Sequence, residues 1–140
     1  MLVTRRAELG ARLAAFEAAF TGLFAHAVDN SGGLTCVSLS GAEHVTVLRH
    51  MGVYDFEALA VGQVVNTVLG KAGGIVLRLE NDGVFLVIRR SFADYLWLLL
   101  RKVAKPYRFA VAQLPESGSH PLLRLLDRQQ GKPARKAVAA

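Results

Sequence analysis

The chain has 140 residues, of which 52% are hydrophobic and 20% are charged, so it is long enough to form one domain with a sizeable core. Its longest uninterrupted apolar stretches, such as residues 95–100, are far too short to span a bilayer, which argues against an integral membrane protein. The only cysteine is Cys36, so an intrachain disulfide is excluded, and we expect a cytoplasmic protein.

The formal net charge of +6 is concentrated toward the C-terminus. Residues 101–140 contain nine lysines and arginines and only two acidic residues, whereas the rest of the chain is nearly neutral. A basic end of this kind is commonly a solubilising tail. It also leaves open an electrostatic contact with nucleic acid, a membrane surface or an acidic protein.

A first helix is predicted over residues 5–27, with Thr4 as its N-cap. Apolar residues recur at spacings of three and four and form one stripe, which is typical of an amphipathic helix: Leu9, Leu13, Phe16, Phe20, Leu23 and Ala27. Glu8 and Arg12 are placed to form an i,i+4 ion pair. The turn-forming stretch DNSGG at 29–33 ends this helix.

Two strands are predicted next, over residues 34–39 and 44–50, joined by a tight turn at 40–43. In the first strand, small residues share one face. In the second, His44 and His50 lie on a polar face opposite the valines, which indicates a strand that is exposed on one side.

A second helix is predicted over residues 56–72, capped by Asp55 and ended by Gly70. Nearly its whole circumference is apolar, so it must be covered on more than one side. We expect one side to pack on the sheet and the other to form a two-fold dimer or partner interface. The candidate interface residues are Val61, Val64, Val65, Val68 and Leu69.

The stretch GGIVLRLENDGVFLVIRRS at 73–91 predicts a hairpin with strands at 75–80 and 84–90 and a turn around Asp82-Gly83. The expected core face consists of alternating apolar residues, namely Ile75, Leu77, Leu79, Leu86 and Ile88. The second strand is apolar on both faces near its end and is expected to be central, with the first strand nearer an edge.

A third helix is predicted over residues 92–104, because Ser91 and Asp94 resemble a capping box. Residues 115–129 are expected to form a short amphipathic helix whose leucines are a candidate partner surface, namely Leu122, Leu123, Leu125 and Leu126. Residues 130–140 are expected to be a disordered basic tail.

The predicted order is therefore α-β-β-α-β-β-α with a short C-terminal helix. Helices placed between antiparallel hairpins indicate an α+β fold, an α/β/α-type layered sandwich with one antiparallel sheet.

In this order of elements the chain resembles the roadblock (dynein light chain) family, within the longin/profilin-like group. The resemblance is carried by the first helix, the hairpin LTCVSLSGAEHVTVLRH, the stretch DFEALAVGQVVNTVLGKA and the final strand and helix DGVFLVIRRSFADYLWLLLRKV. It implies a roadblock-like domain over residues 1–114 and a homodimeric regulator or scaffold that binds a small Ras-like GTPase. Roadblock domains generally have three strands after the second helix, whereas two are expected here.

No catalytic, cofactor-binding or metal site is predicted. The four histidines are scattered without metal-ligand spacing, and neither a P-loop nor a GxGxxG stretch is present. Cys36 lies in an apolar strand and is expected to be inert. Arg89 and Arg90, at the end of a strand, are a candidate contact for an acidic partner.

Two alternatives to a GTPase-binding scaffold stay open from the residues alone. The basic C-terminus is compatible with a nucleic-acid or membrane-surface binder, and the layered fold is compatible with a small-ligand sensor domain.

Overall fold

The structure of the protein is a computed structural model in which residues 1–112 are described. These residues divide into two compact units, one comprising Met1–Asn30 and one that begins at Ser31. The helix predicted at 115–129, with Leu122, Leu123, Leu125 and Leu126, and the tail predicted at 130–140 lie outside the described residues. None of the helices in residues 1–112 combines the length and the hydrophobicity needed to cross a bilayer.

The first unit contains the 3-10 turn η1 (Arg6–Glu8) and the helix α1 (Leu9–Ala19). The helix is shorter than the predicted range of 5–27, because the chain leaves helical geometry at Phe20 and turns at Gly22, where φ is +80°. The Thr4 hydroxyl donates to the Glu8 carboxylate at 3.1 Å and caps no backbone amide. The predicted ion pair between Glu8 and Arg12 is confirmed, with 3.5 Å between nitrogen and oxygen.

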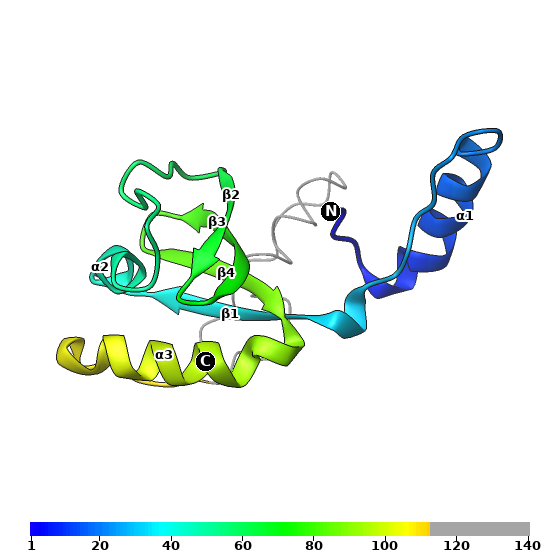
Figure 1. Cartoon of the computed structure of the whole chain (residues 1–140). Helices are drawn as coiled ribbons and strands as arrows, with labels where there is room; N and C mark the ends of the chain where they lie inside the picture. Colours follow the sequence, from blue (N-terminus) through cyan, green and yellow to red (C-terminus); the bar gives the residue numbers. More distant parts are fainter. Residues whose placement is uncertain (113–140) are drawn as a thin grey trace, which may run out of the picture. The chain divides into compact units, whose positions relative to one another are not determined.

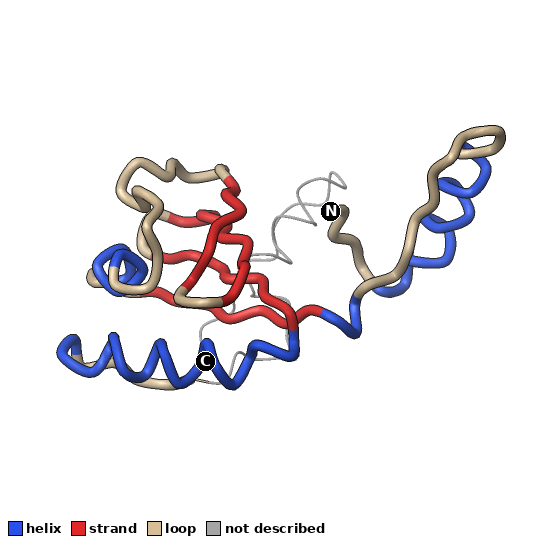
Figure 2. Tube along the Cα trace, viewed as in Figure 1, coloured by secondary structure: helices blue, strands red, loops and turns tan. Residues whose placement is uncertain are grey.

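The second unit is built on one four-stranded antiparallel sheet (Figures 1 and 2). Its strands are β1 (Leu34–Ser40), β2 (Val64–Leu69), β3 (Ala72–Glu80) and β4 (Gly83–Arg89), in the order β1-β4-β3-β2. The predicted α+β class with a single antiparallel sheet is thus confirmed. The predicted central position of the strand at 84–90 is also confirmed. The strand predicted at 75–80 was expected nearer an edge, but β3 is internal as well, and β2 forms the edge beside it.

The helices of this unit are α2 (His44–Arg49) and α3 (Ala93–Ala104), accompanied by the 3-10 turns η2 (Ser31–Gly33), η3 (Arg90–Phe92) and η4 (Lys105–Tyr107). The two helices contribute to one buried core with the same sheet face. The helical members of this core are Val47, Leu48, Leu96, Leu100 and Ala104, and the strand members are Leu69, Val76, Val84, Leu86 and Ile88. Each fully buried large aliphatic side chain stabilises the unit by roughly 1.5–3 kcal/mol.

The strand predicted at 44–50 is wrong, because these residues form α2. The β-branched Val45, Thr46 and Val47 favour a strand locally. In the helix, however, Val47 and Leu48 both reach the core, with 3% and 0% of their surface exposed. A strand would send these two neighbours to opposite faces, so tertiary burial overrides the local preference.

The helix predicted at 56–72 is also wrong, because this stretch consists of a loop and the edge strand β2. Gly62 and Gly70 adopt φ values of +87° and +64°, which a helix interior does not allow. Phe56 and Leu59 fill the core from the loop, with 1% and 2% exposure. Three strands, and not the expected two, therefore follow α2.

The hairpin between β3 and β4 contains an irregularity that changes one of its faces. Leu77 pairs with Phe85 while Glu80 pairs with Gly83, so β3 has an extra residue between these pairs. As a result Val76 joins the core face, and Ile75 and Leu77 lie on the opposite face, contrary to prediction. The predicted core positions of Leu86 and Ile88 are confirmed.

Candidate functional site

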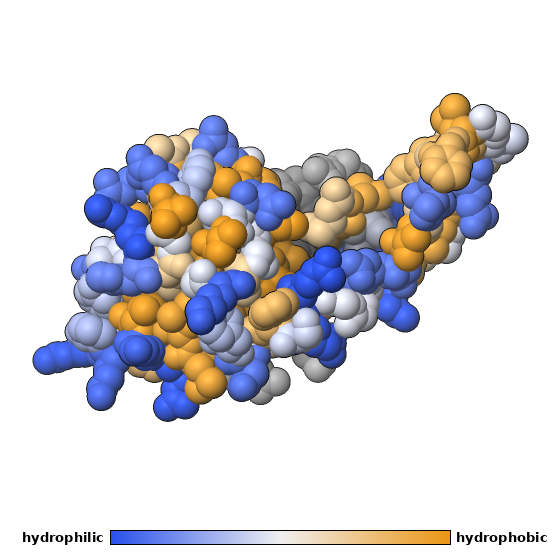
Figure 3. All heavy atoms as spheres, in the orientation of Figure 1, coloured by the Kyte–Doolittle hydropathy of each residue, from blue (hydrophilic) through white to orange (hydrophobic). Residues whose placement is uncertain are grey.

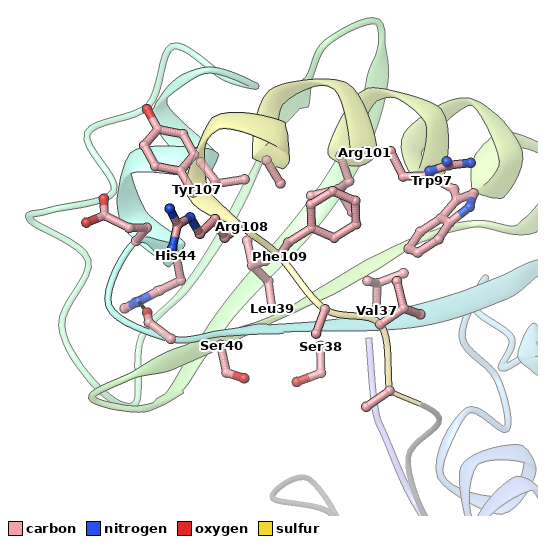
Figure 4. Close-up of a pocket in the computed structure, with 18 of the residues that line it drawn as sticks. Val37, Ser38, Leu39, Ser40, His44, Trp97, Arg101, Tyr107, Arg108 and Phe109 are labelled. Carbon is pink, nitrogen blue, oxygen red and sulfur yellow. Dashed lines mark hydrogen bonds between the residues drawn. The ribbon is translucent and has the colours of Figure 1, made fainter.

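A groove of about 820 Å³ lies within the second unit, along the outer edge of β1. Its walls are the continuous stretches 36–44 and 107–112, together with Val47, Trp97, Leu100, Arg101 and Ala104. Figure 4 shows α3 above β1, with the side chains of Trp97 and Phe109 in the space between them. The groove therefore joins an edge strand, one face of α3, the start of α2 and the chain that follows η4.

The backbone of β1 has a free side that faces away from the sheet. The Gly41 amide donates to the Asp82 carbonyl at 2.8 Å, in the register that continues along β1 and β4. Because bonded and non-bonded pairs alternate in an antiparallel ladder, Val37 and Leu39 direct their backbone groups toward β4. The intervening residues direct theirs outward, namely Cys36, Ser38 and Ser40. Among the described residues, no further strand pairs with this edge.

The groove is lined by Trp97 and Leu100 of α3 and, on the strand side, by Val37 and Leu39, whereas Ser38 and Ser40 point away from α3 (Figure 4). Trp97 and Phe109 are 36% and 42% exposed, which is a large open area for aromatic rings. Ser38 and Ser40 are exposed but project no bulk. An occupant can therefore approach the strand closely while it buries aromatic surface.

His44 is buried in the groove wall, with 6% of its surface exposed. Its Nδ1 lies 2.8 Å from the Gly41 carbonyl oxygen, and because a carbonyl can only accept, Nδ1 carries the hydrogen. The other ring nitrogen, Nε2, is buried without a hydrogen-bond partner among residues 1–112. A buried polar atom without a partner destabilises the fold until an additional group bonds to it.

The charged residues of the groove are Arg101, Arg108 and Glu43. Neither guanidinium forms a hydrogen bond or an ion pair within residues 1–112. Arg108 also has a φ of +52°, the only positive φ among the non-glycine residues described. A left-handed conformation is uncommon for arginine and is often associated with functional segments.

Tyr107 connects the groove to the end of α2. Its hydroxyl group and Nε2 of His50 are 3.0 Å apart, and the two rings are tilted at a centroid distance of 6.1 Å. This contact joins residues far apart in sequence and positions the start of the 107–112 wall.

The predicted interface valines do not lie in the groove, and they do not share a helix. Val61, Val64 and Val68 are 49%, 58% and 51% exposed. Val65 packs partly against the core, and Leu69 is fully buried. The period of two along β2 therefore separates the predicted set into exposed and buried members. Figure 3 shows apolar side chains exposed among polar ones on the visible face.

Arg89 and Arg90 are exposed where β4 passes into η3, outside the groove, and their contact with an acidic partner stays a prediction. The candidate leucines at 122, 123, 125 and 126 lie outside the described residues.

The described residues give little support for metal binding or catalysis at the groove. No group of three or more histidine, cysteine, aspartate or glutamate residues within 1–112 is arranged to hold a metal ion. Cys36, which was expected to be inert, is exposed by surface area. Nearby protein atoms still desolvate its thiol, which raises the pKa above the ordinary 9.0 and keeps the thiol protonated at neutral pH.

Comparison with known proteins identifies a different family from the one the element order resembles. The model of the sarcosine oxidase, gamma subunit family matches residues 8–105. No curated protein matches the chain. This finding overturns the roadblock resemblance and, with it, the GTPase-binding scaffold and the two alternatives, a nucleic-acid or membrane-surface binder and a small-ligand sensor.

A solved structure with a similar fold is a chain of the heterotetrameric sarcosine oxidase from Corynebacterium sp. U-96 in complex with pyrrole 2-carboxylate. The TM-score is 0.58 and the identity is 18%, so the likeness concerns the fold alone. It covers 71% of this chain and 54% of that one, so the present chain spans about half of that relative. Protein partners are supported by these findings, but a small GTPase and a homodimer are not.

Proposed function

The chain belongs to the sarcosine oxidase gamma subunit family, and from this premise we propose that it is a non-catalytic subunit of a heteromeric enzyme that oxidises sarcosine. The single observation that supports this function most strongly is the family match over residues 8–105, which includes the whole sheet and all of α3.

The side chains of the described residues support a structural role. The groove contains one buried histidine and two arginines but no nucleophile paired with a base. Cys36, in the groove wall, has a raised pKa because its thiol is desolvated, which disfavours the reactive thiolate. We therefore assign the chemistry to other subunits and protein contacts to this one.

The exposed valines supply one such contact. Val61, Val64 and Val68 are each about half exposed, and the last two lie on the same face of the edge strand β2. Regularly spaced valines on an exposed edge favour burial against another protein. We assign this surface, the β2 valine surface, to contact with another subunit of the enzyme.

Purification through an affinity tag on this chain, from the cells that produce it, tests the proposed function. The eluate should consume oxygen when sarcosine is added, and the chain produced alone should not. A tagged chain that elutes without sarcosine-dependent oxygen consumption, while the activity stays in the unbound fraction, would contradict the proposal. A catalytically active isolated chain would contradict the non-catalytic role.

A further inference from the structure

We propose that the outer edge of β1 receives an extended segment of a partner subunit, which pairs with it as a fifth strand and presents acidic side chains to Arg101 and Arg108 at the two ends of the groove. The inference rests on the proposed function, because that function supplies the partner subunit. It adds a second contact, distinct from the β2 valine surface.

The backbone of β1 provides the first argument. Cys36, Ser38 and Ser40 direct their amides and carbonyls away from β4, by the alternation that the bond from Gly41 to Asp82 fixes. An edge with unpaired groups of this kind is a template for strand addition. Residues 36–40 extend over about 17 Å at strand spacing, enough for a guest segment of about five residues.

The groove provides the second argument, because it leaves room for that segment. About 820 Å³ lies between the β1 edge, α3 and residues 107–112. Alternate side chains of an added strand point to opposite faces. One set would meet Trp97 and Phe109, which are now 36% and 42% exposed, and the other would pass the small side chains of Ser38 and Ser40.

Charge provides the third argument and determines the chemistry of the guest. Arg101 and Arg108 line the groove without partners among the described residues, and Glu43 is the only acidic residue in its walls. The two side chains lie toward opposite ends of the groove (Figure 4), so a separate carboxylate of the guest would form charge-assisted hydrogen bonds with each guanidinium.

Hydrogen exchange of the β1 amides tests the proposal directly. In the isolated chain, the amides of Cys36, Ser38 and Ser40 should exchange quickly. In the sarcosine-oxidising complex purified through this chain, their exchange should slow by at least about tenfold, as new backbone hydrogen bonds require. The amides of Val37 and Leu39 are the internal control, because they bond to β4 in both states.

A pair of charge variants tests the arginines. Arg101→Gln with Arg108→Gln should make the complex dissociate at least about tenfold more readily, because the carboxylates of the guest lose their charged partners. Lys102→Gln with Lys105→Gln is the matched control. It removes the same charge from the same end of α3 but outside the groove, and should change dissociation by less than about twofold.

A synthetic probe tests the edge without the complex. The probe is the capped heptapeptide Thr-Val-Thr-Glu-Thr-Val-Thr, and its counterpart has lysine in place of glutamate. At millimolar concentration the glutamate peptide should slow exchange at Ser38 in a saturable way, and the lysine peptide should do so less.

The outcomes separate the two proposals. An active complex whose β1 amides exchange as in the isolated chain would overturn the fifth strand and leave the proposed function intact. Slow exchange of the Ser38 amide already in the isolated chain would show that the protein's own chain occupies the β1 edge. That result would also overturn the fifth strand. If no active complex is recovered, the proposed function fails and the peptide measurement alone decides the use of the edge.

Discussion

Gly70 occupies a position that no other residue type fits. Its φ is +64°, and an added Cβ would collide with the Tyr95 hydroxyl oxygen and lie 2.6 Å from Cδ2 of Leu99. Its amide donates to the Met51 carbonyl at 2.5 Å, and the next amide, of Lys71, donates to the Tyr95 hydroxyl at 2.9 Å. One turn between β2 and β3 is thereby held against α3.

Gly70→Ala is therefore expected to destabilise the protein by roughly 2–5 kcal/mol, the sum of the left-handed backbone penalty and the overpacking of α3. Gly62→Ala is the matched control. Its φ is +87°, but nothing lies within 4 Å of an added Cβ, so only the backbone penalty of about 1–2 kcal/mol should apply. Urea denaturation of both variants measures the difference, and equal losses would contradict the described packing of Tyr95 and Leu99.

The Cys36 thiol gives a prediction about pH. Its pKa in the folded protein is raised by desolvation above 9.0, so the folded state retains a proton that the unfolded state loses first. The resulting contribution to stability is present below pH 9.0 and is lost as the pH rises through and above that value. Alkylation of the native chain by iodoacetamide should therefore reach half its maximal rate above pH 9.0. A midpoint below that pH would contradict the desolvation.

At the scale of elements, the sequence of β2 contains the alternation of a strand, but its composition resembles that of a helix. Val64, Asn66 and Val68 are exposed while Leu69 is buried, which is the alternation of a half-exposed strand. The same stretch has enough alanine, valine and leucine to resemble a buried helix. Gly62 and Gly70 at its two ends were the local signals against a helix of that length.

Val64→Lys with Val68→Lys tests the β2 valine surface. Both side chains are more than half exposed and lysine is tolerated on edge strands, so the isolated chain should lose no more than about 1 kcal/mol of stability. Recovery of the sarcosine-oxidising complex should fall at least about tenfold, because two charges would be buried. Val53→Lys replaces a valine that is 99% exposed in a loop, and should leave recovery unchanged. A complex that tolerates both lysines on β2 would contradict the assignment of this surface.

Leu69→Ala provides the opposite case within the same strand. Its side chain is fully buried, so the cavity should destabilise the isolated chain by about 2–5 kcal/mol. Thermal or urea unfolding of the chain alone measures this effect, which requires no partner. A loss of stability as small as that expected for the exposed valines would contradict the burial of Leu69 on the inner face of β2.

The strands β1, β3 and β4 and the helix α3 were predictable as elements from their local patterns, although the irregularity in β3 reversed its predicted core face. The groove was not, because stretches far apart in sequence form it, namely residues 36–44, α3 and residues 107–112. Only the order β1-β4-β3-β2 makes β1 an edge, and no local pattern contains that order. The sequence pattern predicted His44 on the polar face of a strand. Because residues 44–49 form the helix α2, His44 lies in the groove wall instead.

At the scale of the whole molecule, the fold class was predictable and the family was not. Helices on an antiparallel sheet are a layer arrangement that many unrelated functions share, so element order is weak evidence for any one of them. The match over residues 8–105 depends on the sequence along the chain and not on layer order. It replaces the roadblock family with the sarcosine oxidase gamma subunit family.

The central claim is that this chain functions inside a larger enzyme, and sedimentation of the native activity tests it most directly. Cell extract is separated on a density gradient, and each fraction is assayed for this chain and for sarcosine-dependent oxygen consumption. We expect the 15.1 kDa chain to sediment with the activity, in a species several times its own mass. A chain that sediments at its own mass, apart from the fractions that oxidise sarcosine, would contradict the claim.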